Sequence, residues 1–245
     1  MRNPFSSLAF VTLAVLVVAG CGAGDPPSRS GADVEPVTLR ATSYEPGGGI
    51  GSVTLTEFAR RASARSNGAI KIEVGPDPDS SRPDTSAEKI AEIRKGYYDL
   101  GIVAARSFDK LGVSAFQALQ APFLVTSNEL GERILEDGIA DEMLGKLDRL
   151  SLEGLALTYA DRRFPLGYGA PLVSIDDYRG KSVAARPSAA TYATLRALGA
   201  VPTPVNGGDL AAAAEAGTVV GSEGVLAINR PVSPGTITAN TSWYF

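Results

Sequence analysis

The chain has 245 residues, 23 of them basic and 27 acidic, and its net charge of −4 argues against a nucleic-acid partner. It contains no histidine and one cysteine, which excludes histidine-dependent nucleophile triads, HExxH zinc sites and any disulfide within the chain. Glycine-rich phosphate-binding and dinucleotide-binding motifs are also absent from the sequence. The composition therefore favours a binding protein over an enzyme, with no cofactor and no metal.

Residues 1–20 have the three parts of a secretory signal peptide. Arg2 supplies a positive charge, residues 8–18 form an apolar stretch too short to span a membrane, and small residues lead into Cys21. We interpret this pattern as the lipobox of a lipoprotein, in which Cys21 carries lipid after cleavage. The alternative is an ordinary signal peptide with an incidental cysteine. Residues 21–37 are rich in Gly, Pro, Ser and Asp and predict a flexible tether behind the lipid.

Strand and helix patterns alternate after the tether. Strands are predicted at 37–43, 69–74 and 100–104, and helices between them at 54–66 and 86–95. Asn67-Gly68 and Gly96 are expected to end the two helices. Alternation with short connections predicts a parallel or mixed sheet covered by helices.

A second set of elements follows. The predicted elements are a helix over 128–150 interrupted at Gly138, a strand at 154–159, a loop at 164–171, strands at 181–185 and 201–205, and helices at 189–198 and 209–216. We expect two α/β lobes, residues 38–160 and 161–225, with a ligand cleft between them. Residues 226–245 are expected to return towards the first lobe and to be truncated, because an apolar strand ends abruptly at Phe245.

One segment has the spacing of a calcium-binding loop. Asp77, Asp79, Ser81 and Glu88 place oxygen atoms at suitable intervals, but Arg82 occupies the position where the turn needs glycine. A proline-broken surface loop before a helix is the alternative, and we predict no metal site here.

In this order, the segments resemble the extracytoplasmic solute receptors of TRAP transporters, which include dicarboxylate- and sialic-acid-binding receptors. The resemblance runs from about Leu39 to Phe245. The matching stretches are 88–101, Ala121-Pro-Phe-Leu, Asp177-Tyr-Arg-Gly, 195–204 and 216–223, the last being near the family's G-V-V-D-G-Q-E. The resemblance implies a two-lobed periplasmic-binding-protein fold of type II, with mixed sheets flanked by helices. It also implies a small organic, usually anionic, solute and a membrane permease as partner.

The family binds carboxylate through an arginine in a strand after the lobe crossing, and the matching position here is Ala184. Arg186 lies two residues further on, where it is either a substitute on the same strand face or a solvent-facing charge. A second family arginine matches Arg163, which we expect to be the main anionic anchor.

Other family positions give further candidates. Glu88 matches the family's helix glutamate, although a solvated helix charge is an equal interpretation. Tyr44 and Glu45 follow the first strand and are expected to face the cleft, and Tyr168 is expected to pack against the ligand. The family's aromatic and asparagine positions fall on Gly207 and Gly224, which predicts a larger and less polar cleft.

The resulting hypothesis is a solute-binding lipoprotein of a TRAP-type transport system. It binds a small organic solute, closes around it by a hinge and delivers it to a permease. We expect it on the outer face of the cytoplasmic membrane or in the periplasm, held by lipid on Cys21. The alternatives are a diverged sensor or accessory lipoprotein, which the altered site residues favour, and a carboxylate-based hydrolase, which needs two carboxylates across a cleft.

Overall fold

The computed structural model describes residues 35–45, 47–78, 85–159, 162–205, 208–225 and 236–238. The chain divides into two units, Met1–Glu35 and Pro36–Phe245. The predicted signal peptide, Cys21 and most of the tether lie outside the described residues, as do Asp79, Ser81 and Gly207. None of the described helices is long and apolar enough to cross a membrane.

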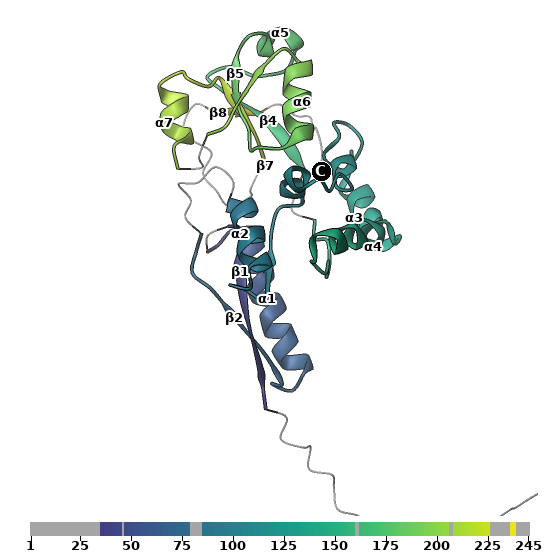
Figure 1. Ribbon diagram of the computed structural model, residues 1–245. Helices are drawn as coiled ribbons and strands as arrows, with labels where there is room; N and C mark the ends of the chain where they lie inside the picture. The colour runs from purple at the N-terminus through teal and green to yellow at the C-terminus, as the bar shows by residue number, and fades with distance from the viewer. Residues whose placement is uncertain are drawn as a thin grey trace, which may run out of the picture. The chain divides into compact units, whose positions relative to one another are not determined.

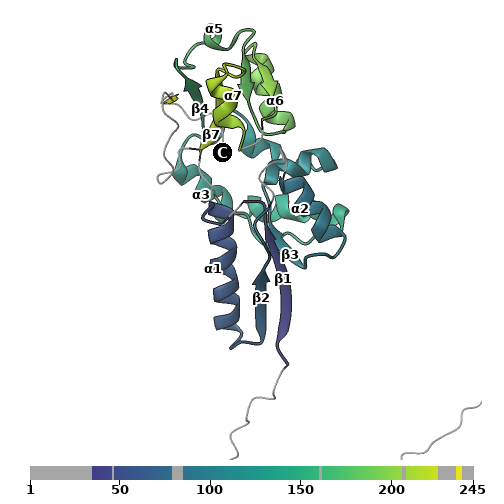
Figure 2. The ribbon, with the colours of Figure 1, turned by 90° about the vertical axis from the view of Figure 1, so that its left-hand side faces the viewer.

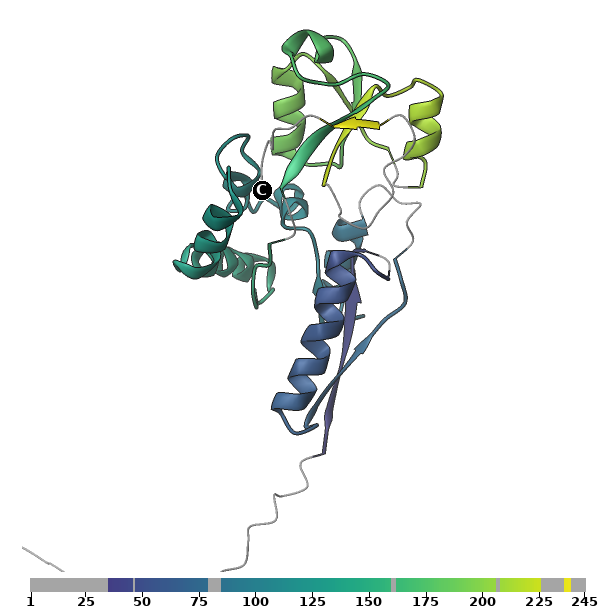
Figure 3. The same ribbon diagram turned by 180° about the vertical axis from the view of Figure 1, so that it is seen from behind.

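The first sheet has three parallel strands in the order β2-β1-β3. Its elements are β1 (Val37–Ser43), α1 (Ile50–Arg65), β2 (Ile70–Val74), α2 (Thr85–Arg94) and β3 (Leu100–Ile102). α1 lies along β1 and β2 (Figures 1 and 3), and its Leu55 side chain is buried. The predicted strand-helix alternation and parallel pairing are confirmed, and Asn67 and Gly68 end α1 with positive φ angles of 50° and 82°.

The chain segment that connects the two sheets forms short helices. They are η1 (Ala105–Leu111), η2 (Gln117–Gln120), α3 (Asn128–Glu136), α4 (Ile139–Gly145) and η3 (Lys146–Leu150). Gly138 separates α3 from α4 with a φ of 78°, as the sequence predicts.

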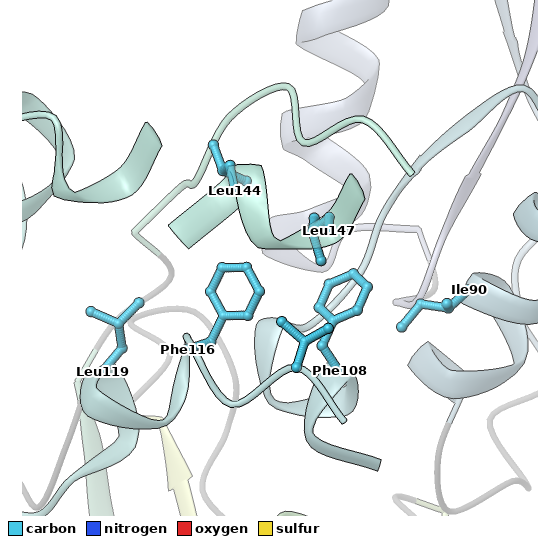
Figure 4. Close-up of a cluster of buried hydrophobic side chains, with 7 residues drawn as sticks. Ile90, Phe108, Phe116, Leu119, Leu144 and Leu147 are labelled. Atoms are coloured by element: carbon cyan, nitrogen blue, oxygen red, sulfur yellow. The ribbon is translucent and has the colours of Figure 1, made fainter. Parts of the chain in front are cut away.

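These helices share a hydrophobic core with α2. Figure 4 shows Phe108 and Phe116 lying beside each other beneath Leu147, with their ring centroids 5.6 Å apart. The core also includes Ile90, Val113, Leu119 and Leu144. Burial of these side chains stabilises the packing of α2 and the short helices against one another.

The second sheet is mixed and has the strand order β6-β5-β7-β4-β8. Its elements are β4 (Arg163–Tyr168), α5 (Ile175–Tyr178), β5 (Ser182–Ala184), α6 (Ala189–Ala197), β6 (Val201–Thr203), α7 (Leu210–Glu215), β7 (Gly221–Val225) and β8 (Thr236–Thr238). β5 is parallel to β6 and β7, whereas β4 is antiparallel to β7 and β8. α6 and α7 flank the sheet on opposite sides (Figures 1 and 2), and Leu195 of α6 is fully buried.

Two sequence predictions in this region are wrong. Residues 154–159 form no strand, and residues 163–168 form β4 instead of part of the predicted loop 164–171. Residues 154–159 have the apolar pattern of a strand but pair with no described strand. Residues 163–168 contain Pro165 and Gly167, which disfavour strands, yet β7 and β8 hydrogen-bond to both edges of β4.

Parallel and mixed sheets flanked by helices confirm the predicted α/β fold class.

Candidate functional site

Tyr44 and Arg106 follow neighbouring strands of the first sheet. Ser43 at the end of β1 pairs with Ile102 at the end of β3, and the Tyr44 backbone N–H donates to the Ile102 carbonyl oxygen at 3.1 Å. Arg106 lies in the first turn of η1, four residues beyond β3. Because β1 and β3 are parallel, their carboxyl ends meet at one edge, which is where ligands bind in many α/β sheets. The two side chains therefore extend from this edge.

Tyr44 is half-buried at that edge. Burial raises the pKa of its hydroxyl, the nearby Glu45 carboxylate raises it further, and the charges of Arg106 and Arg163 lower it. Tyr44 is thus a neutral hydroxyl close to two guanidinium groups, as a ligand-contacting tyrosine would be.

Glu45 makes a hydrogen bond to the adjacent helix α1. Its Oε2 accepts a hydrogen bond of 2.8 Å from the backbone N–H of Gly51, in the first turn of α1. The first N–H groups of a helix have no partner within the helix, so this carboxylate stabilises the start of α1. A direct contact between Glu45 and ligand stays a prediction.

Arg163 and Glu223 form an ion pair across β4 and β7, in which the Arg163 Nε–H donates to Glu223 Oε2. The Glu223 side chain is 1% exposed and that of Arg163 is 17% exposed. Pro165 lies opposite Glu223 in the antiparallel register, so Arg163 reaches the carboxylate diagonally. The predicted anionic anchor thus already has a carboxylate partner within the protein.

Tyr168 lies at the other end of β4. Its hydroxyl and the Ser222 hydroxyl are 2.8 Å apart and share a hydrogen bond. Burial raises the pKa of the Tyr168 hydroxyl, and the Ser222 contact lowers it. Tyr168 and Arg163 are therefore both held by β7, through neighbouring residues Ser222 and Glu223.

Arg106 is a candidate site residue that the sequence did not predict. Its side chain is half-buried, and the pKa of its guanidinium is lowered to about 10, chiefly by burial. The positive charges of Arg163 and Arg186 contribute to this lowering, while Glu223 and Tyr44 act in the opposite direction. Charged residues of both sheets therefore act on Arg106. The sequence signal that could have indicated it is an arginine four residues after a short apolar strand.

Ala184 and Arg186 lie close to the end of β5. β5 ends at Ala184, which is buried and pairs with Ser222, and Arg186 lies two residues beyond the end of the strand. Arg186 is half-buried, and both interpretations of this residue, as a ligand anchor and as a solvent-facing charge, stay predictions. Its charge acts on Arg106, which brings it into the same group.

Glu88 is half-buried in the first turn of α2. An acidic side chain at this place interacts favourably with the helix dipole, and a ligand contact of Glu88 stays a prediction. Gly224 pairs with Phe164, and a β-carbon on it would lie 2.9 Å from Leu166 Cδ1. This position therefore supplies no polar group to a ligand.

Arg163, Arg186, Glu223 and Tyr44 all act electrostatically on Arg106, and we call these five residues the basic cluster. A different pocket is lined by Asp141, Leu144, Gly145, Asp148, Glu153 and Gly154, and its acidic lining is unsuited to an anion. Among the described residues, no three potential ligands are grouped to hold a metal ion.

Comparisons with known proteins agree with this fold. Residues 49–230 match the family of bacterial extracellular solute-binding proteins, family 7. Over 168 residues the chain is 26% identical to the C4-dicarboxylate-binding periplasmic protein DctP of Rhodobacter capsulatus, a match that covers 68% of this chain and 49% of that protein.

Solved TRAP periplasmic solute-binding proteins have the same fold. The protein from Ochrobactrum anthropi has a TM-score of 0.67 and 23% identity, with 78% of this chain and 59% of that chain covered. The protein from Roseobacter denitrificans, with bound β-D-glucuronate, has a TM-score of 0.67 and 18% identity, with coverages of 76% and 61%. The protein from Sulfurospirillum deleyianum, with bound succinate, has a TM-score of 0.65 and 19% identity, with coverages of 77% and 60%.

The chain spans about half the length of the curated relative and about three fifths of these solved structures. The family match nevertheless covers most of the chain and confirms the resemblance seen in the sequence. The chain belongs to family 7 of the bacterial extracellular solute-binding proteins, the solute receptors of TRAP transporters.

Proposed function

We propose that this protein is an extracytoplasmic receptor that binds a small organic anion and delivers it to a TRAP-type membrane permease. The basic cluster is the observation that carries the proposal, because it gathers three guanidinium groups against one buried carboxylate. Arginine pairs with carboxylates through parallel charge-assisted hydrogen bonds, so this excess of positive charge suits an organic acid.

The relatives support this solute class. The Rhodobacter capsulatus relative binds C4-dicarboxylates, and two of the similar structures hold glucuronate and succinate. We propose that residues 38–160 and 161–225 act as two lobes that close by a hinge around such a solute. Arg163 and Arg186 would face it as cationic groups, with Tyr44 and Tyr168 beside it.

The receptor would bind and release its solute without covalent chemistry. The family is one of receptors, and the excess charge of the cluster is positive, whereas a glycosidase-type hydrolase requires a pair of carboxylates.

We further propose that lipid on Cys21 holds the receptor at the membrane, with residues 21–37 as its tether. A lipid anchor would keep the receptor near a permease while the tether lets it reach the solute.

One observation favours a second candidate, a receptor-like sensor or accessory lipoprotein that is not coupled to transport. Ala184 stands where the family has its carboxylate-binding arginine, and it is buried without any polar side chain. A transport assay would decide between the two. If the receptor is coupled to transport, cells that carry it with its permease take up the solute, and cells without the receptor do not.

A thermal-shift experiment on the purified full chain tests the binding function. Organic acids such as succinate and glucuronate should raise the melting temperature, because a ligand that binds only the folded state stabilises it. Glycerol and glucose serve as neutral controls and should leave it unchanged. Stabilisation by neutral solutes alone would overturn the proposal. Mass spectrometry of solute that co-purifies with the protein would then identify the natural ligand.

A further inference from the structure

We infer that the end of the first sheet beside the tether is a surface that contacts anionic phospholipid headgroups. This surface, which we call the tether end, is formed by Val37, Arg61, Arg65, Ile70 and Lys71. The inference rests on the proposed lipid anchor, which would bring this end of the protein to the bilayer. It goes beyond the anchor because it gives the folded part of the receptor its own contact with lipid.

The start of β1, the end of α1 and the start of β2 lie together (Figures 1 and 3). The Val37 N–H donates to the Ala69 carbonyl oxygen at 2.8 Å, and Val37 pairs with Ile70 in the parallel register. Residues 66–69 form the turn between α1 and β2. The last turn of α1 therefore ends beside the point at which the tether joins the sheet.

The charge of this region is opposite to that of the whole chain. Residues 57–71 contain four basic side chains and one acidic side chain, Glu57, and so have a net charge of +3, whereas the chain has a net charge of −4. Residues 21–35 contain one basic and three acidic side chains. The positive charge thus belongs to the folded end of the sheet and not to the tether.

Two of the basic side chains have no acidic partner in the described part of the chain. Glu57 pairs with Arg60 and Arg61, each at 2.7 Å. Arg65 and Lys71 are exposed and form no ion pair with a described residue. Basic side chains at a protein surface attract the anionic headgroups of a lipid leaflet.

Two exposed apolar side chains lie at the same end. Val37 and Ile70 are opposite each other in the register and are 55% and 38% exposed, whereas Ala41 further along β1 is fully buried. Apolar side chains beside lysine and arginine are typical of surfaces that lie in a membrane interface. The long basic side chains reach the headgroups while their apolar neighbours contact the acyl boundary.

The proposed anchor makes a weak contact sufficient. Each basic side chain near an anionic leaflet strengthens binding about fivefold, and this attraction extends over a Debye length of about 8 Å. A flexible chain of 16 residues, the number from Cys21 to Pro36, spans about 20 Å. An anchored receptor would therefore meet the bilayer at a high effective concentration.

The contact would also orient the candidate site. β1 and β2 are parallel, so the tether end contains their amino ends, while Tyr44 follows the carboxyl end of β1. A strand of this length spans about 20 Å at about 3.3 Å per residue. With the tether end on the bilayer, the strand ends that carry Tyr44 and Arg106 face away from the lipid.

Vesicle co-sedimentation tests the contact. The processed chain, residues 21–245, carries Cys21→Ala so that acyl chains make no contribution, and its compact unit from Pro36 onward is retained. We expect binding to phosphatidylglycerol vesicles at low salt and none to phosphatidylcholine vesicles. Raising the salt concentration to about 0.15 M should weaken the binding strongly, because the charges are exposed and become screened.

Two triple variants with the same change in net charge locate the contact. Arg61→Gln, Arg65→Gln and Lys71→Gln together should weaken binding to phosphatidylglycerol vesicles at least about tenfold. The control combines Arg133→Gln, Lys146→Gln and Arg149→Gln, which are exposed on the helices α3 to η3, and should bind as the parent chain does.

The outcomes separate this inference from the proposals on which it rests. Equal weakening by both triple variants, equal binding to both kinds of vesicle, or no binding to phosphatidylglycerol at low salt would overturn the inference. Both variants should keep the melting temperature of the parent chain and its rise with organic acids. A failed anchor would instead be seen as a missing acyl mass on Cys21, and a failed receptor function as a missing thermal shift.

Discussion

At the scale of single residues, the ion pair between Arg163 and Glu223 determines what the candidate site can do. Sequence comparison predicts Arg163 as a ligand anchor, but it gives no indication that a carboxylate sixty residues later is its partner. The pair joins β4 to β7 and places a nearly inaccessible negative charge among three arginines. Glu223 thus both compensates Arg163 and reduces the repulsion felt by Arg106.

We predict that Glu223→Gln destabilises the protein by roughly 3 kcal/mol, because breaking a buried ion pair leaves an uncompensated charge. The remaining guanidinium of Arg163 would also repel Arg106 and Arg186 more strongly. Urea unfolding of the unliganded protein measures this effect. Glu153→Gln, at an exposed position, is the control and should unfold at the same urea concentration as the unmodified protein. Equal midpoints for all three proteins would contradict the prediction.

At the scale of elements, the short helix α5 depends on its first turn. Asp177 Oδ2 accepts hydrogen bonds from the backbone N–H groups of Val173 and Ser174 and from the Ser174 hydroxyl, at 3.0, 2.7 and 2.8 Å. These contacts, chiefly those from Ser174, lower the pKa of the Asp177 carboxyl. The capped turn positions Tyr178, whose hydroxyl donates to the Leu172 carbonyl oxygen at 3.0 Å within the core of the second sheet.

We predict that Asp177→Ala lowers the melting temperature at neutral pH, whereas Asp176→Ala at the neighbouring exposed position changes it little. A carboxyl group whose pKa is lowered by folding contributes stability above its unfolded pKa of about 3.9, and this contribution is lost as the pH falls below that value. The difference between the unmodified protein and Asp177→Ala should therefore shrink below about pH 4. Thermal unfolding monitored by circular dichroism from pH 7 to pH 3 measures it, and a constant difference would refute the role of the ionised carboxylate.

At the scale of the whole molecule, contacts between distant segments unite the elements of residues 36–245. The Ser188 hydroxyl caps α6 by accepting from the Thr191 N–H, and it also donates to Gln120 Oε1 at 2.6 Å. Ser188, Thr191 and Gln120 are all buried. This contact links η2, which follows the first sheet, to a helix of the second sheet, two residues from Arg186.

The proposed lipid anchor is also a property of the whole molecule. We predict that Cys21→Ala moves the protein from the membrane fraction to the soluble fraction, because each buried methylene of a lipid chain contributes about 0.8 kcal/mol to membrane binding. Cell fractionation and the mass of the N-terminal peptide measure the change. Ser28→Ala, within the predicted tether, should leave the protein in the membrane fraction. Membrane retention of Cys21→Ala without any acyl mass would disprove the anchor.

Local sequence patterns were sufficient for much of the fold. The strands and helices between residues 37 and 104 could be predicted because their apolar residues recur at strand or helical spacing and these patterns agree with the tertiary packing. Asn67-Gly68 and Gly96 mark the ends of the helices. Local patterns fail where pairing between strands outweighs the intrinsic strand propensity of the residues. β4 contains proline and glycine and exists because β7 and β8 lie on both sides of it, whereas the apolar residues 154–159 find no partner strand among the described residues.

By itself, the sequence determined the α/β class, the receptor family and the absence of histidine or disulfide chemistry, because these depend on composition, spacing and ordered motifs. Only the tertiary structure decided that Arg163 pairs with Glu223 and that Arg106 belongs to the basic cluster. These residues come from β4, β7, the end of β3 and the end of β5, far apart in the chain. Their electrostatic coupling depends on strand order and register, which no local pattern of residues encodes.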